Sequence, residues 1–147
     1  MNPAHRITVS VPRPWVTRTD PDHGIVVAAR SREVPASGFP PELVVRSVPV
    51  DTDLTAWRGE AVEAMAVQLD RFELEEDDEF RLGDHVVSYR RFAYRHGATD
   101  VLCDQWAWVV DGIGITLTGS VARPDYPTYC DVFEDVAATL EVVRQAA

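Results

Sequence analysis

The sequence predicts an α+β fold, in which an antiparallel β-sheet built as a meander has helices packed on it. Between residues 71 and 122, turn dipeptides separate runs of alternating apolar residues, as in consecutive antiparallel strands. Two segments, residues 54–70 and 129–140, instead carry apolar side chains at intervals of three and four, the period of a helix. No repeat, low-complexity tract or Gly/Ser-rich linker divides the 147 residues, so we expect one domain over residues 1–147.

The part of the chain before the meander predicts short strands and one helix. The first strand begins at Ile7, and Pro12 and Pro14 end it. The helix begins after Asp53, because Asp and Thr side chains at residues 51–53 can accept hydrogen bonds from the first backbone N–H groups. Further strands are expected at residues 24–30 and 42–50, with a Pro-Asp-His-Gly turn at 21–24 and an irregular Pro/Gly loop at 35–41.

The turns of the meander predict which side chains share a face of the sheet. Asp111-Gly112 suits a two-residue type I′ turn, which places Val110 opposite Ile113. Because strand side chains alternate, counting back from this turn puts one apolar set on the same face. With a two-residue turn at 83–84 and a short loop around 96–97, this tryptophan face comprises Phe80, Leu82, Val87, Tyr89, Leu102, Trp106, Trp108, Val110, Ile113, Ile115, Leu117 and Val121.

The opposite face of the meander, called the second face below, mixes small, polar and aromatic side chains. It comprises Ser88, Arg90, Phe92, Tyr94, Cys103, Gln105, Ala107, Thr116, Thr118 and Ser120. The C-terminal helix has a clean apolar stripe and must pack on the sheet. The pattern leaves two arrangements open. Either this helix shares the tryptophan face with the first helix, leaving the second face open, or it covers part of the second face in a three-layer sandwich.

Composition excludes several classes of partner. The chain has 14 Arg, no Lys and 24 Asp plus Glu, a formal net charge of −10. Such a chain has no basic block that could replace the counterions of phosphate groups, so we expect no nucleic-acid binding. It also repels anionic lipid surfaces. No apolar run is long enough to insert into a membrane, and no signal peptide is recognisable. We therefore expect a cytoplasmic protein in which Cys103 and Cys130 are free thiols.

No motif of the sequence specifies a chemistry. The glycines form no phosphate-binding loop, no serine lies in a nucleophile elbow, and the four histidines lack metal-ligand spacing. The acidic run at residues 75–79 is interpreted as a solvated turn. The Asp-Pro-Asp-His run at residues 20–23 is interpreted first as a turn, and only second as a site of chemistry. The sequence thus predicts no catalytic residue, metal or cofactor, and no enzyme activity.

The best candidate contact with a partner is the aromatic part of the second face. An arginine beside aromatic side chains, on a face poor in aliphatic residues, has the composition of a protein contact. The candidate partner-binding residues are Arg90, Phe92, Tyr94, Gln105 and, from the irregular loop, Phe39. The alternatives are that a helix or solvent simply takes this face, and that Phe39 plugs the edge of the core.

These observations favour a non-catalytic protein-binding module, adaptor or chaperone-like, with another protein of unknown identity as partner and a homodimer as one option. The alternative is a small-molecule-binding protein or enzyme with an apolar pocket between sheet and helices. Trp57, Trp106 and Trp108 would line that pocket, with a gate near residues 20–23.

Several segments together resemble the PsbP-like superfamily, in particular its bacterial DcrB- and LpqN-type branch. They are residues 7–15 (ITVSVPRPW), 38–45 (GFPPELVV), 105–120 (QWAWVVDGIGITLTGS) and 133–142, which is similar to a last helix entering a terminal strand. The resemblance implies an α/β/α sandwich, an antiparallel sheet between helices, in proteins that mostly bind other proteins and carry no inheritable catalytic site.

Overall fold

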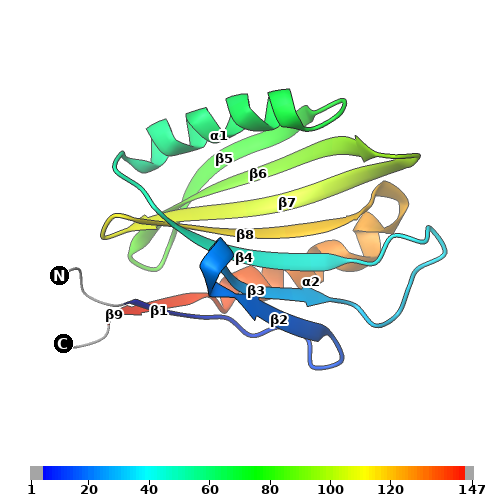
Figure 1. Ribbon diagram of the computed structural model, residues 1–147, viewed down its shortest axis with the longest axis horizontal. Coiled ribbons are helices and arrows are strands. Elements are labelled where there is room, and N and C mark those ends of the chain that lie inside the picture. The colour runs from blue at the N-terminus through cyan, green and yellow to red at the C-terminus, as the bar shows by residue number, and fades with distance from the viewer. Residues whose placement is uncertain (1–4, 145–147) are drawn as a thin grey trace.

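Residues 5–144, the part of the chain that the computed structural model describes, form a seven-stranded sheet, a two-stranded sheet and two α-helices (Figure 1). The strands of the large sheet are all antiparallel and follow the order β2-β3-β4-β8-β7-β6-β5. In chain order the elements are β1 (His5–Thr8), β2 (Val16–Asp20), β3 (Ile25–Arg30), β4 (Glu42–Pro49), α1 (Leu54–Gln68), β5 (Glu73–Leu82), β6 (His85–His96), β7 (Thr99–Val110), β8 (Ile113–Ala122), α2 (Tyr126–Ala138) and β9 (Glu141–Arg144).

The predicted α+β class and the predicted register of the meander are confirmed. Asp111 and Gly112 both have positive φ angles, 49° and 77°, as a type I′ turn requires. Trp106 pairs with Leu117 and Trp108 with Ile115, as expected from that turn. Both tryptophans are buried in the main core, so the tryptophan face points inward.

The C-terminal helix α2 packs on the tryptophan face. Phe133, Val136 and Ala137 are buried there against the sheet. Phe133 lies so close to β8 that a Cβ on Gly119 would come within 2.5 Å of its ring. The small β1–β9 sheet covers the remainder of this face through Ile7 and Val142. The terminal strand implied by the family resemblance is therefore present.

Helix α1 lies on the second face, which makes the fold a three-layer α/β/α sandwich. It begins where expected, with the Asp53 side chain accepting a hydrogen bond from the backbone N–H of Ala56 at 2.8 Å. Trp57 packs against β8 from this side, since a Cβ on Gly114 would come within 2.6 Å of its ring. The three-layer sandwich considered from the sequence is therefore confirmed, but the helix that covers the second face is the first one and not the last.

Four local predictions were wrong or incomplete. The edge strand β2 was missed, and the first strand already ends at Thr8. The acidic run at residues 75–79 lies inside edge strand β5 and is not a turn. Helix α2 begins three residues early, at Tyr126. Within residues 5–144 neither helix is long and apolar enough to cross a membrane.

Candidate functional site

A chain of buried polar side chains lies between α1 and the sheet, and is called the arginine cluster here. Arg90 on β6 donates from Nε to Asp77 Oδ1 at 3.1 Å and from Nη1 to the backbone oxygen of Arg58 at 2.6 Å. Arg58 on α1 donates to Gln105 Oε1. Gln105 in turn donates from Nε2 to Thr118 Oγ1 at 3.0 Å. The cluster therefore connects helix α1 to strands β5, β6, β7 and β8.

The arginine cluster holds more positive than negative charge. Arg58 and Arg90 are only 4% and 7% exposed, and the one carboxylate paired with them, Asp77, is about half exposed at 47%. Burial, together with the neighbouring Arg90 charge, lowers the pKa of Arg58 to about 10. The Nε of Arg58 is also buried without a hydrogen-bond partner in the described part of the chain. A buried cation with incomplete pairing carries a desolvation cost, so an anion nearby would be favoured.

Two of the predicted contact residues are covered by α1. Arg90 belongs to the arginine cluster, and Phe92 is only 3% exposed in a small core with Val101 and Cys103. For Arg90 and Phe92 the alternative weighed from the sequence, that a helix takes this face, is therefore the correct one. Their side chains hold α1 to the sheet because the helix supplies the backbone carbonyl and the apolar contacts that a partner was expected to supply.

The other predicted contact residues lie at the margin of this covered area. Phe39 and Tyr94 are half-buried and pack on the small core of Phe92, as do Met65 and Leu69 at the end of α1. Phe39 thus plugs the core edge, the alternative weighed for it. Burial raises the pKa of Tyr94 to about 12, so this hydroxyl stays protonated at neutral pH. Gln105 is half-buried, with its amide used inside the arginine cluster.

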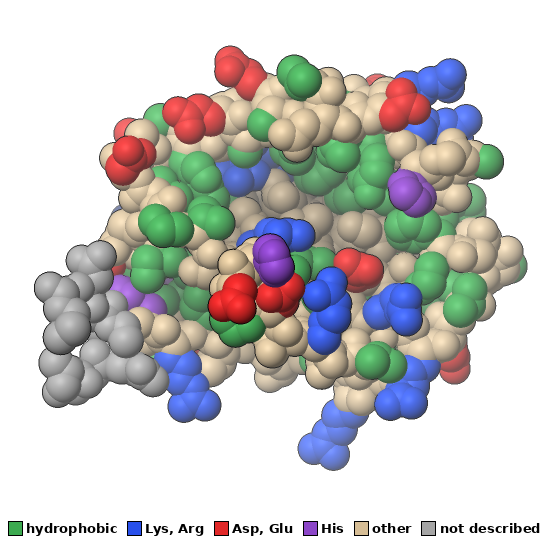
Figure 2. Space-filling model, in the orientation of Figure 1, with side chains coloured by type: hydrophobic (Ala, Val, Ile, Leu, Met, Phe, Trp, Pro, Cys, Tyr) green, Lys and Arg blue, Asp and Glu red, His purple; other side chains and the backbone are tan. Residues whose placement is uncertain are grey.

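The remainder of this side of the sheet, over β2, β3, β4 and β8, is called the open face. Figure 2 shows the molecule hollowed between α1 and the β2–β3 hairpin, with basic side chains gathered over β2 and β3. By strand register and alternation, the side chains of the open face are Val16, Arg18, Ala28, Arg30, Glu42, Val44, Arg46, Val48, Thr116, Thr118 and Ser120. Apart from the buried Ala28 they are half-buried or exposed.

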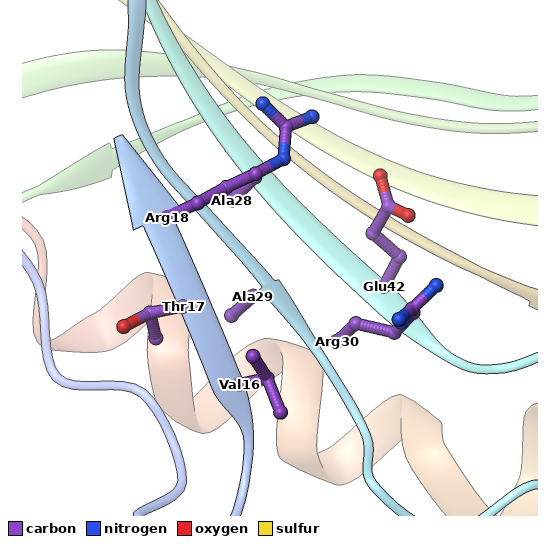
Figure 3. A pocket seen from close by; sticks show the side chains of 7 residues that line it. All are labelled: Val16, Thr17, Arg18, Ala28, Ala29, Arg30 and Glu42. Carbon is purple, nitrogen blue, oxygen red and sulfur yellow. The ribbon is translucent and has the colours of Figure 1, made fainter. Parts of the chain in front are cut away.

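A cavity of about 240 Å³ lies at the β2–β3 end of the open face. Its lining includes Arg18, Arg30 and Glu42, whose side chains project to the same side of the strands, away from α2 (Figure 3). This volume is below the range of about 300–1,000 Å³ usual for small-molecule sites. The cavity is thus a charged recess in a surface and not an enclosed ligand pocket.

Three solved structures share this arrangement over nearly the whole chain. LpqN from Mycobacterium tuberculosis, involved in cell envelope biogenesis, superposes with a TM-score of 0.76 at 13% identity, covering 96% of this chain and 85% of LpqN. Cyanobacterial PsbP from Synechocystis gives 0.62 at 16% identity, with 97% and 95% covered. The Saccharomyces cerevisiae Ran-binding protein Mog1p gives 0.62 at 14% identity, with 98% and 97% covered.

The chain has a PsbP-like fold of the LpqN type. The resemblance seen in the sequence is therefore confirmed at the level of the fold. No protein-family model and no curated protein matches the sequence. At identities of 13 to 16%, these neighbours define the PsbP-like fold alone, and the site must be argued from this chain's own residues.

The proposed tryptophan pocket is not present in this PsbP-like fold. Trp106 and Trp108 lie on the tryptophan face under α2, whereas Trp57 packs on the other side of the sheet. The sheet separates them, so the three rings cannot line one cavity. The expected gate residues form a short 3-10 turn, Pro21–His23, in which His23 Nδ1 and Asp20 Oδ2 share a hydrogen bond of 2.8 Å at the surface.

Sequence reasoning missed two buried ionisable groups. Arg58 was overlooked because its side chain is charged, although it lies on the apolar side of its helix, four residues after Leu54 and three before Ala61. Asp104 is 1% exposed on the tryptophan face, where it accepts hydrogen bonds from Tyr89 at 2.6 Å and Tyr126 at 3.1 Å. Burial raises the pKa of Asp104 and outweighs the lowering by the two hydroxyls and by Arg91. The signal that could have revealed Asp104 is its place in the alternating pattern of the strand, where it falls on the same side as the buried residues of the tryptophan face.

Within residues 5–144 the structure shows no group of side chains suited to bind a metal ion and no activated thiol. No three His, Cys, Asp or Glu side chains there are grouped so that they could hold a metal ion. Cys103 and Cys130 are both free, as expected, and Cys103 is buried while Cys130 is half-buried. Burial raises the pKa of Cys103 to about 12, so its thiol is uncharged at neutral pH and a poor nucleophile.

Proposed function

We propose that this chain is a non-catalytic protein-binding module, adaptor or chaperone-like, that contacts its partner through the open face. The observation that carries the proposal is the uneven covering of the sheet. Helix α2 and the β1–β9 sheet cover the tryptophan face, and α1 covers the β6–β7 part of the second face, while the open face stays exposed to solvent. Its arginines favour a protein contact, because arginine is enriched at the contact surfaces between proteins.

The structural neighbours support the same class of function. Mog1p is a Ran-binding protein, so a PsbP-like fold is able to serve as a protein-binding module. A small-molecule function has less support, because the tryptophans lie on opposite sides of the sheet and the recess on the open face is shallow and charged. The cytoplasmic location of the chain and its assembly as a homodimer remain predictions.

Site-specific crosslinking tests the proposal in cells. A photoreactive benzoylphenylalanine replaces Thr118 in the middle of the open face. In the matched control it replaces Val67, which is 87% exposed on α1. We expect a covalent adduct from Thr118 and none from Val67. No adduct from Thr118, or equal adducts from both positions, would contradict the proposal.

The adduct must then be connected to binding by the unmodified chain. The protein identified by mass spectrometry is purified, and its affinity is measured by titration calorimetry. We expect Thr118→Trp, which fills the open face, to weaken binding at least tenfold, and Val67→Trp to leave it unchanged. An adduct of twice the chain mass would identify a second copy as the partner. Arg90→Ala is not a suitable test, since Arg90 holds α1 to the sheet.

A further inference from the structure

Three arginines on the open face lack a carboxylate partner. Arg18, Arg30 and Arg46 come from the adjacent strands β2, β3 and β4, and all three are exposed. None of them forms an ion pair within the described residues, where the pairs involve Arg90, Arg91 and Arg123 and two histidines instead. Glu42 lies opposite Arg30 in the register, and Asp20 at the end of β2 lies in the same row as Arg46 but is hydrogen-bonded to His23. The open face therefore carries a net positive charge in a chain whose overall charge is −10.

The strand register sets the spacing of these arginines. Arg18 lies opposite Ala28, and Ala28 lies opposite Val44. With strands about 4.8 Å apart and a rise of about 3.3 Å per residue, the Cα of Arg30 lies about 8 Å from that of Arg18 and about 14 Å from that of Arg46. In an extended peptide, side chains at positions i, i+2 and i+4 repeat at about 7 and 13 Å on one side. On the same spacing, the Cα of Arg18 lies about 12 Å from that of Arg46. Arg30 and Arg46 are thus spaced like side chains at positions i and i+4 of an extended segment, and Arg18 lies about 7 Å to one side of the line between them.

The surroundings of the three arginines favour the same occupant. Val44 on β4, and Thr116 and Thr118 beside it on β8, are half-buried and small, so a backbone can approach the sheet closely there. Thr118 accepts a hydrogen bond from Gln105, which links the open face to the arginine cluster. There Arg58 and Arg90 add positive charge that Asp77 only partly balances. Guanidinium groups bind carboxylates through paired hydrogen bonds, the strongest recognition available to this surface.

We propose that the open face binds an extended acidic segment of a partner protein, with carboxylates at positions i and i+4 seated on Arg30 and Arg46 and with Arg18 beside the segment. This inference rests on the proposed function and names the chemistry of its partner. Nucleic acid is disfavoured, because its affinity depends on many phosphate contacts and the chain offers few basic groups.

The binding test uses a fluorescein-labelled peptide of twelve residues that alternates Glu and Thr, followed by fluorescence anisotropy at low salt. The matched peptide has Gln in place of Glu. The open-face variant combines Arg18→Gln, Arg30→Gln and Arg46→Gln. The control variant removes the same amount of charge from exposed arginines on other surfaces, by Arg6→Gln, Arg13→Gln and Arg81→Gln. Circular dichroism and the unfolding midpoint check that both variants fold.

We expect the Glu peptide to bind the full chain, with at least tenfold weaker binding to the open-face variant and at most twofold weaker binding to the control variant. Added salt should weaken binding, and the Gln peptide should not bind. Equal binding of both peptides, or equal losses in both variants, overturns the inference. The inference is also overturned if a twelve-nucleotide single strand binds the full chain more tightly than the Glu peptide does and fails to bind the open-face variant.

Failure of this inference is distinguishable from failure of the proposed function. If the adduct from position 118 forms equally well in the open-face variant and the Glu peptide does not bind, the acidic-segment inference fails and the proposed function stands. If no adduct forms from position 118 in either background, the proposed function fails.

Discussion

Replacing Gly119 by alanine should destabilise the protein, because the new methyl group has no space under α2. A Cβ at this position would lie 2.5, 2.6 and 2.7 Å from three ring carbons of Phe133. Carbon atoms in contact normally stay about 3.5–4.0 Å apart, so the overlap is about 1 Å. Phe133 is fully buried and cannot swing into water. Overpacking of this kind costs about 1–3 kcal/mol, and we expect Gly119→Ala to lower the free energy of unfolding by that amount.

A double-mutant cycle measured by chemical denaturation tests the cause. Phe133→Ala alone should cost about 3–5 kcal/mol, as is usual for a buried aromatic residue. In that background the ring is gone, so Gly119→Ala should cost nothing or even stabilise by about 0.5–1 kcal/mol, since alanine loses less backbone entropy than glycine. If the two losses simply add, α2 is not seated over Gly119, and the account of which face is covered is wrong. The open face would then have to be assigned again.

Three further changes test other parts of the fold by the same denaturation measurement. Gly59→Ala, with open space around its Cβ on the exposed side of α1, should stabilise by about 0.5–1 kcal/mol, and a loss would contradict the helical environment assigned to it. Asp53→Ala removes the N-cap hydrogen bond to the backbone N–H of Ala56 and should lower the free energy of unfolding by about 0.5–2 kcal/mol, whereas Asp53→Asn should change it little. Asp104 has a pKa raised by burial, so the folded chain binds its proton more tightly than the unfolded chain. The stability of the native chain relative to Asp104→Asn should therefore increase as the pH falls through this raised pKa, and a constant difference between pH 7 and pH 4 would refute it.

The hairpins could be predicted from sequence because their determinants are local. Asp111-Gly112 specifies one turn type, and the turn specifies the register of every pair behind it. Edge strand β2 and the acidic first part of edge strand β5 could not be recognised in the same way, because neither carries an apolar alternation, whereas Phe80 and Leu82 at the end of β5 were placed by the turn at 83–84. Strand β5 is held by charge instead, with Asp77 opposite Arg90 and Glu76 opposite Arg91 in the register and both pairs bonded. Acidic residues across from consecutive arginines were the available signal, and the run was interpreted as a turn because only its polarity was considered.

The position of α1 depends on contacts that the sequence pattern does not reveal. The fully buried residue of this helix is Arg58, a charged side chain that an apolar stripe omits. Its partners Arg90 and Gln105 were predicted to bind a protein because of their composition, and that chemistry is correct: they do bind an element that presents a backbone carbonyl and a guanidinium. The element belongs to the same chain. A sequence shows which surface is suited to a contact, but not whether the occupant lies in the chain itself. On the open face, the exposed side chains of Arg18, Arg30 and Arg46 form no ion pair with any of residues 5–144, and it is on these guanidinium groups that we propose a partner's carboxylates bind.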